Sequence, residues 1–316
     1  MRLALMTEPQ QGLNYLEILG AVRAAEDAGL EAFFRADHFA SFPGPAGLPT
    51  TDAWSTLAGL ARDTTRIRLG SLVSPVTFRI PGVFAKQVAT VAEMSGGRIE
   101  VGMGAGWNED EHRQLGIPFP DLGERYDMFE EAVAIVHGLW TEPDGWSFDG
   151  RHWQVEGARF APRPASEARR HPNLILGGDG GPRLSRLVAR YADEFNLVSA
   201  TPEKAREAYR RVTSACEELG RDPDLVARSA MTGVLLAETD AELRDRVRAQ
   251  LEMIGAGADD ADAWLANRRE RWILGTVDQA RERVAALEAA GVQRIMLQDF
   301  LPRDLDMIKL MPRLAA

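Results

Sequence analysis

The chain of 316 residues is acidic, with 37 lysines and arginines against 47 aspartates and glutamates, and its formal net charge is −10. Hydrophobic residues make up 45% of the chain and charged residues 27%, a balance that allows a full buried core and excludes a disordered or collagen-like protein. The net negative charge disfavours unspecific attraction to nucleic acid or anionic lipid, so a phosphate-bearing ligand has to be bound by local groups.

The N-terminal sequence indicates the cellular compartment, and the single cysteine limits the chemistry that thiol groups can perform. Residues MRLALMTEP lack the long apolar region and the cleavage site of a signal peptide, and no stretch approaches the roughly 20 apolar residues that span a bilayer. We therefore expect a cytoplasmic protein without a membrane partner. Cys216 lies within a helical pattern, and as the only cysteine it excludes a disulfide framework and a thiolate metal cluster.

Short apolar runs alternate with amphipathic runs along nearly the whole chain, which is typical of strand–helix units that build a parallel sheet. We expect strands at residues 3–6, 31–36, 67–73, 98–103, 173–177, 194–198, 226–237 and 292–298. The helical patterns cover residues 15–28, 51–62, 81–94, 125–139, 182–191, 202–219, 277–290 and 304–314, with a further helix from residue 240.

Two stretches break this alternation. Residues 140–172 contain several prolines, glycines and aromatic residues without a sustained period, so we expect a surface excursion with a small hairpin near Asp149 and Gly150. Residues 255–271 begin with a patch rich in glycine and aspartate that indicates an inserted loop or lid.

Eight strands with intervening helices favour a (β/α)8 TIM barrel over an open doubly wound sheet, and we expect residues 1–316 to form one such domain. The absence of Gly-x-Gly-x-x-Gly after the first strand supports this choice. In such barrels the functional residues lie on loops at the carboxyl ends of the strands.

The end of the second strand carries an acid and an imidazole, Asp37 and His38. A histidine can donate or accept a proton near neutral pH, and His38 is the only histidine placed directly at an expected strand end. The other four are interpreted as surface or packing residues: His112, His137, His152 and His171.

Small residues and a tryptophan follow the fourth strand. Ala105 and Gly106 let a ligand approach the backbone, Trp107 offers a flat face, and Asn108 adds polarity. The acidic run at residues 109–111 that comes next is typical of a helix start facing solvent, and no spacing of His, Asp or Glu resembles a metal motif, so we expect no metal.

A glycine loop follows the fifth strand and leads into a helix that starts at Pro182. Bare backbone N–H groups at a helix start suit a phosphate, although the Gly-Lys-Ser/Thr of a P-loop is missing. The loop consists of Gly177, Gly178, Asp179, Gly180 and Gly181.

These segments resemble the bacterial-luciferase-like flavin and deazaflavin oxidoreductases, a family whose fold is a (β/α)8 barrel with an insertion. The resemblance covers most of the chain and rests on the order and spacing of short motifs at residues 36–39, 69–79, 95–98, 104–108, 116–120, 123–126, 177–180, 191–193 and 275–277.

The resemblance implies roles for the strand-end residues. Asp37 and His38 would lie against the cofactor ring, with His38 as the candidate proton donor or a polar group facing the substrate. A non-proline cis peptide would join Leu72 and Val73 beneath the ring. Residues 105–108 would border the ring and the ribityl chain, and the glycine loop at residues 177–181 would receive the phosphate. Arg125 and Tyr126 are weaker candidates.

The form Gly-Ala-Gly-Trp-Asn at 104–108, followed by Gly-Ile-Pro-Phe-Pro at 116–120, resembles the branch that uses the deazaflavin coenzyme F420. It implies an oxidoreductase that transfers a hydride between C5 of F420 and a small organic substrate, with a homodimer as the expected assembly. An FMN-dependent monooxygenase with a partner reductase remains an alternative, as does a cofactor-binding protein without a reaction of its own. Three loops would set the substrate and could form a lid, but their sequences do not indicate which substrate binds: residues 40–50, 140–172 and 255–271.

Overall fold

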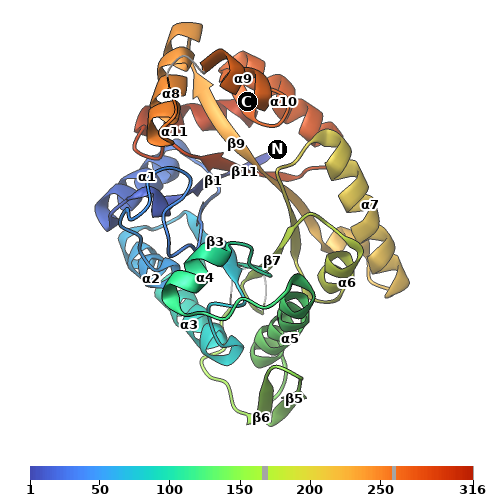
Figure 1. Cartoon of the computed structure of the whole chain (residues 1–316). Coiled ribbons are helices and arrows are strands. Elements are labelled where there is room, and N and C mark those ends of the chain that lie inside the picture. Colours follow the sequence, from blue (N-terminus) through green and yellow to red (C-terminus); the bar gives the residue numbers. More distant parts are fainter. Residues whose placement is uncertain (166–169, 258–260, 316) are drawn as a thin grey trace.

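In the computed structural model, which describes residues 1–165, 170–257 and 261–315, eight parallel strands close into a barrel that helices surround (Figure 1). Around the ring the strands are β1 (Arg2–Thr7), β2 (Ala32–Arg35), β3 (Arg68–Pro75), β4 (Ile99–Gly104), β7 (Asn173–Gly178), β8 (Glu194–Val198), β9 (Ala227–Ala237) and β11 (Arg294–Asp299). Pairing of β11 with β1 and of β8 with β9 completes the ring, so all carboxyl ends meet at one mouth.

The helices are α1 (Tyr15–Ala28), α2 (Ala53–Asp63), α3 (Pro81–Met94), α4 (Glu109–Leu115), α5 (Leu122–Thr141), α6 (Pro182–Tyr191), α7 (Pro202–Glu218), α8 (Asp240–Met253), α9 (Ala261–Arg268), α10 (Val277–Ala289) and α11 (Leu305–Leu310). Short 3-10 turns occur at η1 (Pro9–Gln11), η2 (Pro223–Leu225) and η4 (Met311–Ala315). Across the described part of the chain, no helix combines the length and apolar character needed to cross a membrane.

All eight expected strands are barrel strands, and the expected hairpin is present as the antiparallel pair β5 (Trp146–Asp149) and β6 (Gln154–Ala158). The segment at 255–271 was expected to be a loop, but among its described residues it contains α9 and leads to β10 (Ile273–Thr276), which pairs with β9 outside the ring. Sequence periodicity missed both because α9 is short and β10 has four residues.

Both faces of the barrel strands are buried, which explains why these strands are continuous apolar runs. One face packs against the helices, and the other fills the barrel interior with side chains that include Met6, Phe34, Leu72, Ile175 and Met296. Phe34 needs the space at Gly70 of β3, where a Cβ atom would lie 2.6 Å from its ring. The interior is therefore a packed core and not a channel.

A cluster of charged side chains closes the barrel at the amino ends of the strands. Arg294 of β11 donates to Glu100 of β4 at 2.7 and 3.1 Å and to Glu194 of β8 at 3.2 Å, and all three side chains are buried. Arg68 and Asn173 supply further hydrogen bonds to Glu100, at 2.6 and 2.8 Å. Burial alone would raise the pKa of Glu100, but Arg294 and Arg68 outweigh it and lower that pKa to about 2.

Glu100→Gln should lower the free energy of unfolding by about 3 kcal/mol at neutral pH, because it leaves Arg294 buried without its principal countercharge. Denaturant unfolding followed by circular dichroism measures the change. Glu109→Gln, an exposed carboxylate at the start of α4, is the control and should change the free energy of unfolding by less than about 0.5 kcal/mol.

The same pair predicts a pH dependence. A carboxylate with a lowered pKa in the folded state stabilises the protein fully above its unfolded pKa, and this stabilisation is lost as the pH falls toward the folded value. The stability difference between wild type and Glu100→Gln should therefore shrink as the pH falls from about 5 to about 2. A difference that stays constant over this range would show that the Glu100 charge does not stabilise the fold.

Candidate active site

A buried ion pair organises the ends of β2 and β3 at the mouth. Arg79 donates to both carboxylate oxygens of Asp37, at 2.6 and 3.1 Å, and Ser74 donates its hydroxyl to Asp37 at 2.7 Å. Arg79 also reaches Asp52, the N-cap residue of α2, at 2.6 Å. Burial would lower the pKa of Arg79, but Asp37 and Asp52 raise it above its ordinary value, so the guanidinium stays charged.

This network encloses Asp37. Its side chain has 0% exposed surface and both oxygens are engaged by protein groups, so the carboxylate is not exposed to the mouth in this conformation. The contacts connect the strand ends, and a place for Asp37 against the cofactor ring stays a prediction.

His38 projects at the mouth and is held by a carboxylate from α4. Its Nδ1 lies 2.8 Å from Oε1 of Glu111, whose Oε2 accepts the backbone N–H of Phe39 at 2.9 Å. Glu111 is 1% exposed, whereas 13% of the His38 side chain is exposed. No described residue bonds to Nε2 of His38, so this nitrogen is the one available to a ligand.

Aromatic side chains surround the His38 ring. Phe42 and Trp107 both meet it edge to face, at centroid distances of 4.5 and 5.7 Å, and they contact each other at 5.2 Å. Trp107 is 65% exposed, an unusual amount for a tryptophan, so a large flat surface is available at the mouth. This exposed aromatic face is the one expected of Trp107, and the contact of residues 105–108 with a cofactor stays a prediction.

Three glycines make room for Val73 at the centre of the mouth. A Cβ atom at Gly104 would lie 2.6 Å from Val73 Cγ2, and Cβ atoms at Gly102 and Gly177 would lie 3.0 and 2.9 Å from Val73 Cγ1. The pairing of β3 with β4 shifts register between Ser71 and Ser74, and the Leu72–Val73 peptide is cis, as the resemblance implied. These glycines therefore set how far Val73 reaches into the mouth.

The glycine loop joins β7 to α6 as expected. Gly178 and Gly180 have φ angles of 156° and 69°, and Gly181 is the N-cap of α6 without a side-chain hydrogen bond to the helix start. The first N–H groups of α6 are thus free of side-chain capping, which is the arrangement that binds phosphate. Asp179 is the exposed residue of this loop.

The two weaker candidates at the start of α5 differ from each other. Arg125 is buried, packs over Phe119 at 3.9 Å and donates to the Pro120 carbonyl at 2.5 Å, so it is a packing residue. Burial, and then the negative charge of Asp179 in the glycine loop, raise the pKa of Tyr126.

Besides the Asp37–Arg79 and His38–Glu111 pairs, a further group of polar residues lies where β1 and β11 end. Glu8 accepts one hydrogen bond from Gln10 at 2.6 Å and one from Gln298 at 2.5 Å. Gln10 also donates to the Phe42 carbonyl at 3.5 Å, which ties this group to the loop that carries the aromatic residues. The mouth is therefore polar near β1 and aromatic near β2 and β4.

Sequence comparison assigns this barrel to a known family. Residues 1–294 match the family described as luciferase-like monooxygenase. The chain belongs to this family.

Two relatives illustrate the range of the luciferase-like family. Pyrimidine monooxygenase RutA from Stutzerimonas stutzeri (strain A1501) is 31% identical over 222 residues, which are 69% of this chain and 58% of the relative. The F420-dependent glucose-6-phosphate dehydrogenase of Beutenbergia cavernae is 33% identical over 195 residues, 61% of this chain and 54% of the relative. The chain thus matches little more than half the length of these curated relatives.

Solved structures show the same luciferase-like fold. An F420-dependent secondary alcohol dehydrogenase in complex with an F420–acetone adduct has a TM-score of 0.81 and 19% identity, and the match covers 99% of this chain and 98% of that one. The monooxygenase RslO1 from Streptomyces bottropensis has a TM-score of 0.80 and 22% identity, with 98% and 97% covered.

Sequence reasoning missed the position of Glu111 and left open whether His112 is a surface or a packing residue. Glu111 was assigned to a solvent-facing acidic run, yet it is buried against His38 because α4 turns one side toward the barrel. His112, interpreted as a surface or packing residue, is fully buried between the Thr77 hydroxyl and the Asn108 carbonyl, at 2.7 and 2.6 Å. Within the described ranges, no three His, Cys, Asp or Glu side chains are grouped to hold a metal ion.

The fit of Val73 between glycines can be tested by a double-mutant cycle. Gly104→Ala should destabilise the protein by about 1 to 3 kcal/mol, since its Cβ atom would overlap Val73. In a Val73→Ala background the same substitution should cost less than half as much, because the overlapping methyl group is gone. Denaturant unfolding of the four proteins measures this coupling. Gly20→Ala, where a Cβ atom meets nothing within 4 Å, is the control, and equal costs in both backgrounds would disprove the contact.

Proposed function

We propose that the chain is an F420-dependent oxidoreductase that transfers a hydride between C5 of the deazaflavin and a small organic substrate. The observation that carries this proposal is the His38–Glu111 pair, which leaves Nε2 of His38 at the mouth without a described partner. Hydride transfer to a carbonyl requires one proton on the oxygen, and the reverse reaction removes it. An imidazole fixed beside the reacting atoms meets this need.

The residues at the mouth fit an elongated cofactor with a flat ring and a phosphate. Trp107 offers an exposed aromatic face near His38, and the uncapped start of α6 follows the glycine loop. When bound, F420 supplies a hydride carrier at C5 that reacts poorly with oxygen. The F420-dependent relatives among sequences and solved structures support this choice.

The side chains of this protein would orient the substrate and move the proton. Glu111 holds the His38 ring through Nδ1, so Nε2 would face the substrate oxygen. The imidazolium would donate its Nε2 proton in reduction, and the neutral imidazole would accept a proton at Nε2 in oxidation. Phe42 and Trp107 would exclude water from this point, because they contact both the imidazole and each other. Asp37 and Arg79 would keep the β2 and β3 ends in place.

A second candidate is an FMN-dependent monooxygenase that receives reduced flavin from a partner reductase. The match to pyrimidine monooxygenase RutA favours it, because that match covers a larger share of this chain than the match to the F420-dependent dehydrogenase. The two functions differ in cofactor and in oxygen consumption.

A side-by-side fluorescence titration of the full chain with F420 and with FMN tests the proposal. We expect micromolar binding of F420 and negligible binding of FMN in the same buffer. The reverse result, together with oxygen consumption on addition of reduced FMN, would replace the proposal by the monooxygenase.

Substitution of His38 tests the proton transfer. With any hydride acceptor or donor found in a panel of carbonyl compounds, alcohols and enones, His38→Ala should reduce kcat by about a hundredfold or more, while the Kd for F420 changes little. Glu111→Gln should reduce kcat less, because its amide oxygen still accepts from Nδ1. Glu109→Gln, two positions earlier and exposed, is the matched control. An unchanged kcat in His38→Ala would reject His38 as the proton donor.

A further inference from the structure

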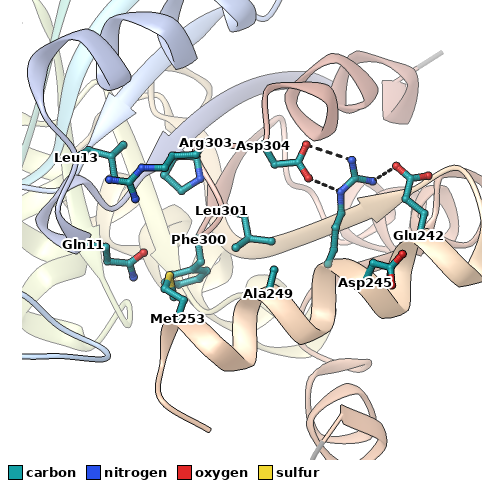
Figure 2. A pocket seen from close by; sticks show the side chains of 12 residues that line it. Gln11, Leu13, Glu242, Asp245, Ala249, Met253, Phe300, Leu301, Arg303 and Asp304 are labelled. Carbon is teal, nitrogen blue, oxygen red and sulfur yellow. Dashed lines mark hydrogen bonds and ion pairs between the residues drawn. The ribbon is translucent and has the colours of Figure 1, made fainter. Parts of the chain in front are cut away.

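A groove of about 590 Å³ lies beside the mouth, between α8 and the segments that follow β1 and β11 (Figure 2). Its size is within the range of small-molecule sites, and it is built partly from strand-end loops, where barrel enzymes place their ligands. Apolar side chains form much of its wall, among them Leu13, Met253, Phe300 and Leu301. None of these residues belongs to the site described above.

One glutamine in this groove has an unused hydrogen-bonding group. Gln11 is 5% exposed, and in the described structure neither its Nε2 nor its Oε1 has a hydrogen-bond partner. Figure 2 shows its carboxamide directed toward Phe300 and Met253. Buried amides without partners are rare in proteins, so this carboxamide has the capacity to hydrogen-bond a molecule that enters the groove.

The carboxamide is also free to turn. The terminal torsion of a glutamine is broad, and no hydrogen bond holds it at Gln11, in contrast to the anchored carboxylate of Asp37. Both atoms are buried in this conformation, so a ligand would bind them only after the carboxamide turns toward the groove, where its donor and acceptor would stand side by side. The complement is a ligand edge with one acceptor and one donor, as in an amide or a lactam.

The charges in the groove favour a neutral ligand. Arg246 is bound by Asp304 at 2.6 Å and by Glu242, and Arg303 is bound by Glu17 at 2.6 Å. The remaining carboxylate of the wall, Asp245, pairs with Arg248. Each of these charged groups already has a partner of opposite sign, so an ion finds no unpaired countercharge here, and the hydrogen-bonding capacity of Gln11 is what remains.

The inner end of the groove adjoins the mouth through an aromatic stack. Phe300 lies face to face with Trp272 at 5.2 Å, and the Trp272 indole covers Gly233 of β9, where no Cβ atom would fit. The loop after β2 reaches the same region, since a Cβ atom at Gly44 would lie 2.6 Å from the Met253 carbonyl. A ligand in the groove would therefore sit beside the mouth and against the end of α8.

We propose that this groove is a second ligand site, which binds a neutral compound with an apolar body and an amide or lactam edge paired to the Gln11 carboxamide. The site goes beyond the proposed oxidoreductase activity and does not depend on it.

Two bicyclic probes of nearly equal shape test the site: 3,4-dihydroquinolin-2(1H)-one, a lactam, and 2-tetralone, in which the N–H is a methylene group. Ligand-observed NMR on the full chain without cofactor should show binding of the lactam at least about fivefold tighter than binding of the ketone. Gln11→Leu should abolish this preference, and Gln114→Leu, an exposed glutamine on α4, should leave it unchanged.

A second variant keeps the proposal testable if Gln11→Leu fails to fold. Ala249 is an exposed groove residue of α8, and Ala249→Phe should fill the groove and abolish binding of both probes without touching Gln11. His38→Ala should leave lactam binding intact, which separates the groove from the mouth. Equal binding of the two probes, no binding of either, or binding unaffected by Ala249→Phe would overturn the proposal, whatever the F420 titration gives.

Discussion

Two hydrogen bonds accepted by one buried carboxylate connect the segment that carries His38 to α4 at the mouth. Glu111 accepts from the imidazole of His38 with one oxygen and from the backbone of Phe39 with the other. It thereby joins α4 to the segment after β2, and it directs Nε2 of His38 away from the protein. Trp107 and Phe42 lie around the same imidazole, so the aromatic surface and the proposed proton-transferring group share one support.

Buried charges act differently at the two ends of the barrel. At the amino ends of the strands, Arg294 pairs with Glu100 and Glu194 and closes the barrel interior, an end of the barrel that contributes to stability. At the carboxyl ends, Asp37 and Arg79 hold two strand ends while His38 remains partly exposed. A buried ion pair is costly to break because either partner alone would be left uncompensated, and this makes the strand ends at the mouth rigid. Rigid strand ends position a proton donor more precisely than a loop would.

The strand and helix pattern was readable from the sequence because barrel strands buried on both faces give continuous apolar runs, and Gly or Pro marks their ends. The glycine loop and the small residues after β4 could be located because they directly follow such apolar runs. Glu111 was not, because three acidic residues in a row look alike in sequence, and only the direction in which α4 packs distinguishes the buried one. The ion pair of Asp37 was not foreseen, because Arg79 lies 42 positions away along the chain. The sequence gives no signal for the unpartnered amide of Gln11, because the lack of a hydrogen-bond partner depends on how distant segments pack around it.

The account rests on Glu111 fixing the His38 ring with its proton on Nδ1, and ¹⁵N NMR of the imidazole nitrogens tests this most directly. In the neutral form, wild type should show a protonated Nδ1 and an unprotonated Nε2, and Glu111→Leu should lose this preference because nothing then accepts from Nδ1. A wild-type spectrum with the proton on Nε2, or one that Glu111→Leu leaves unchanged, would contradict the account.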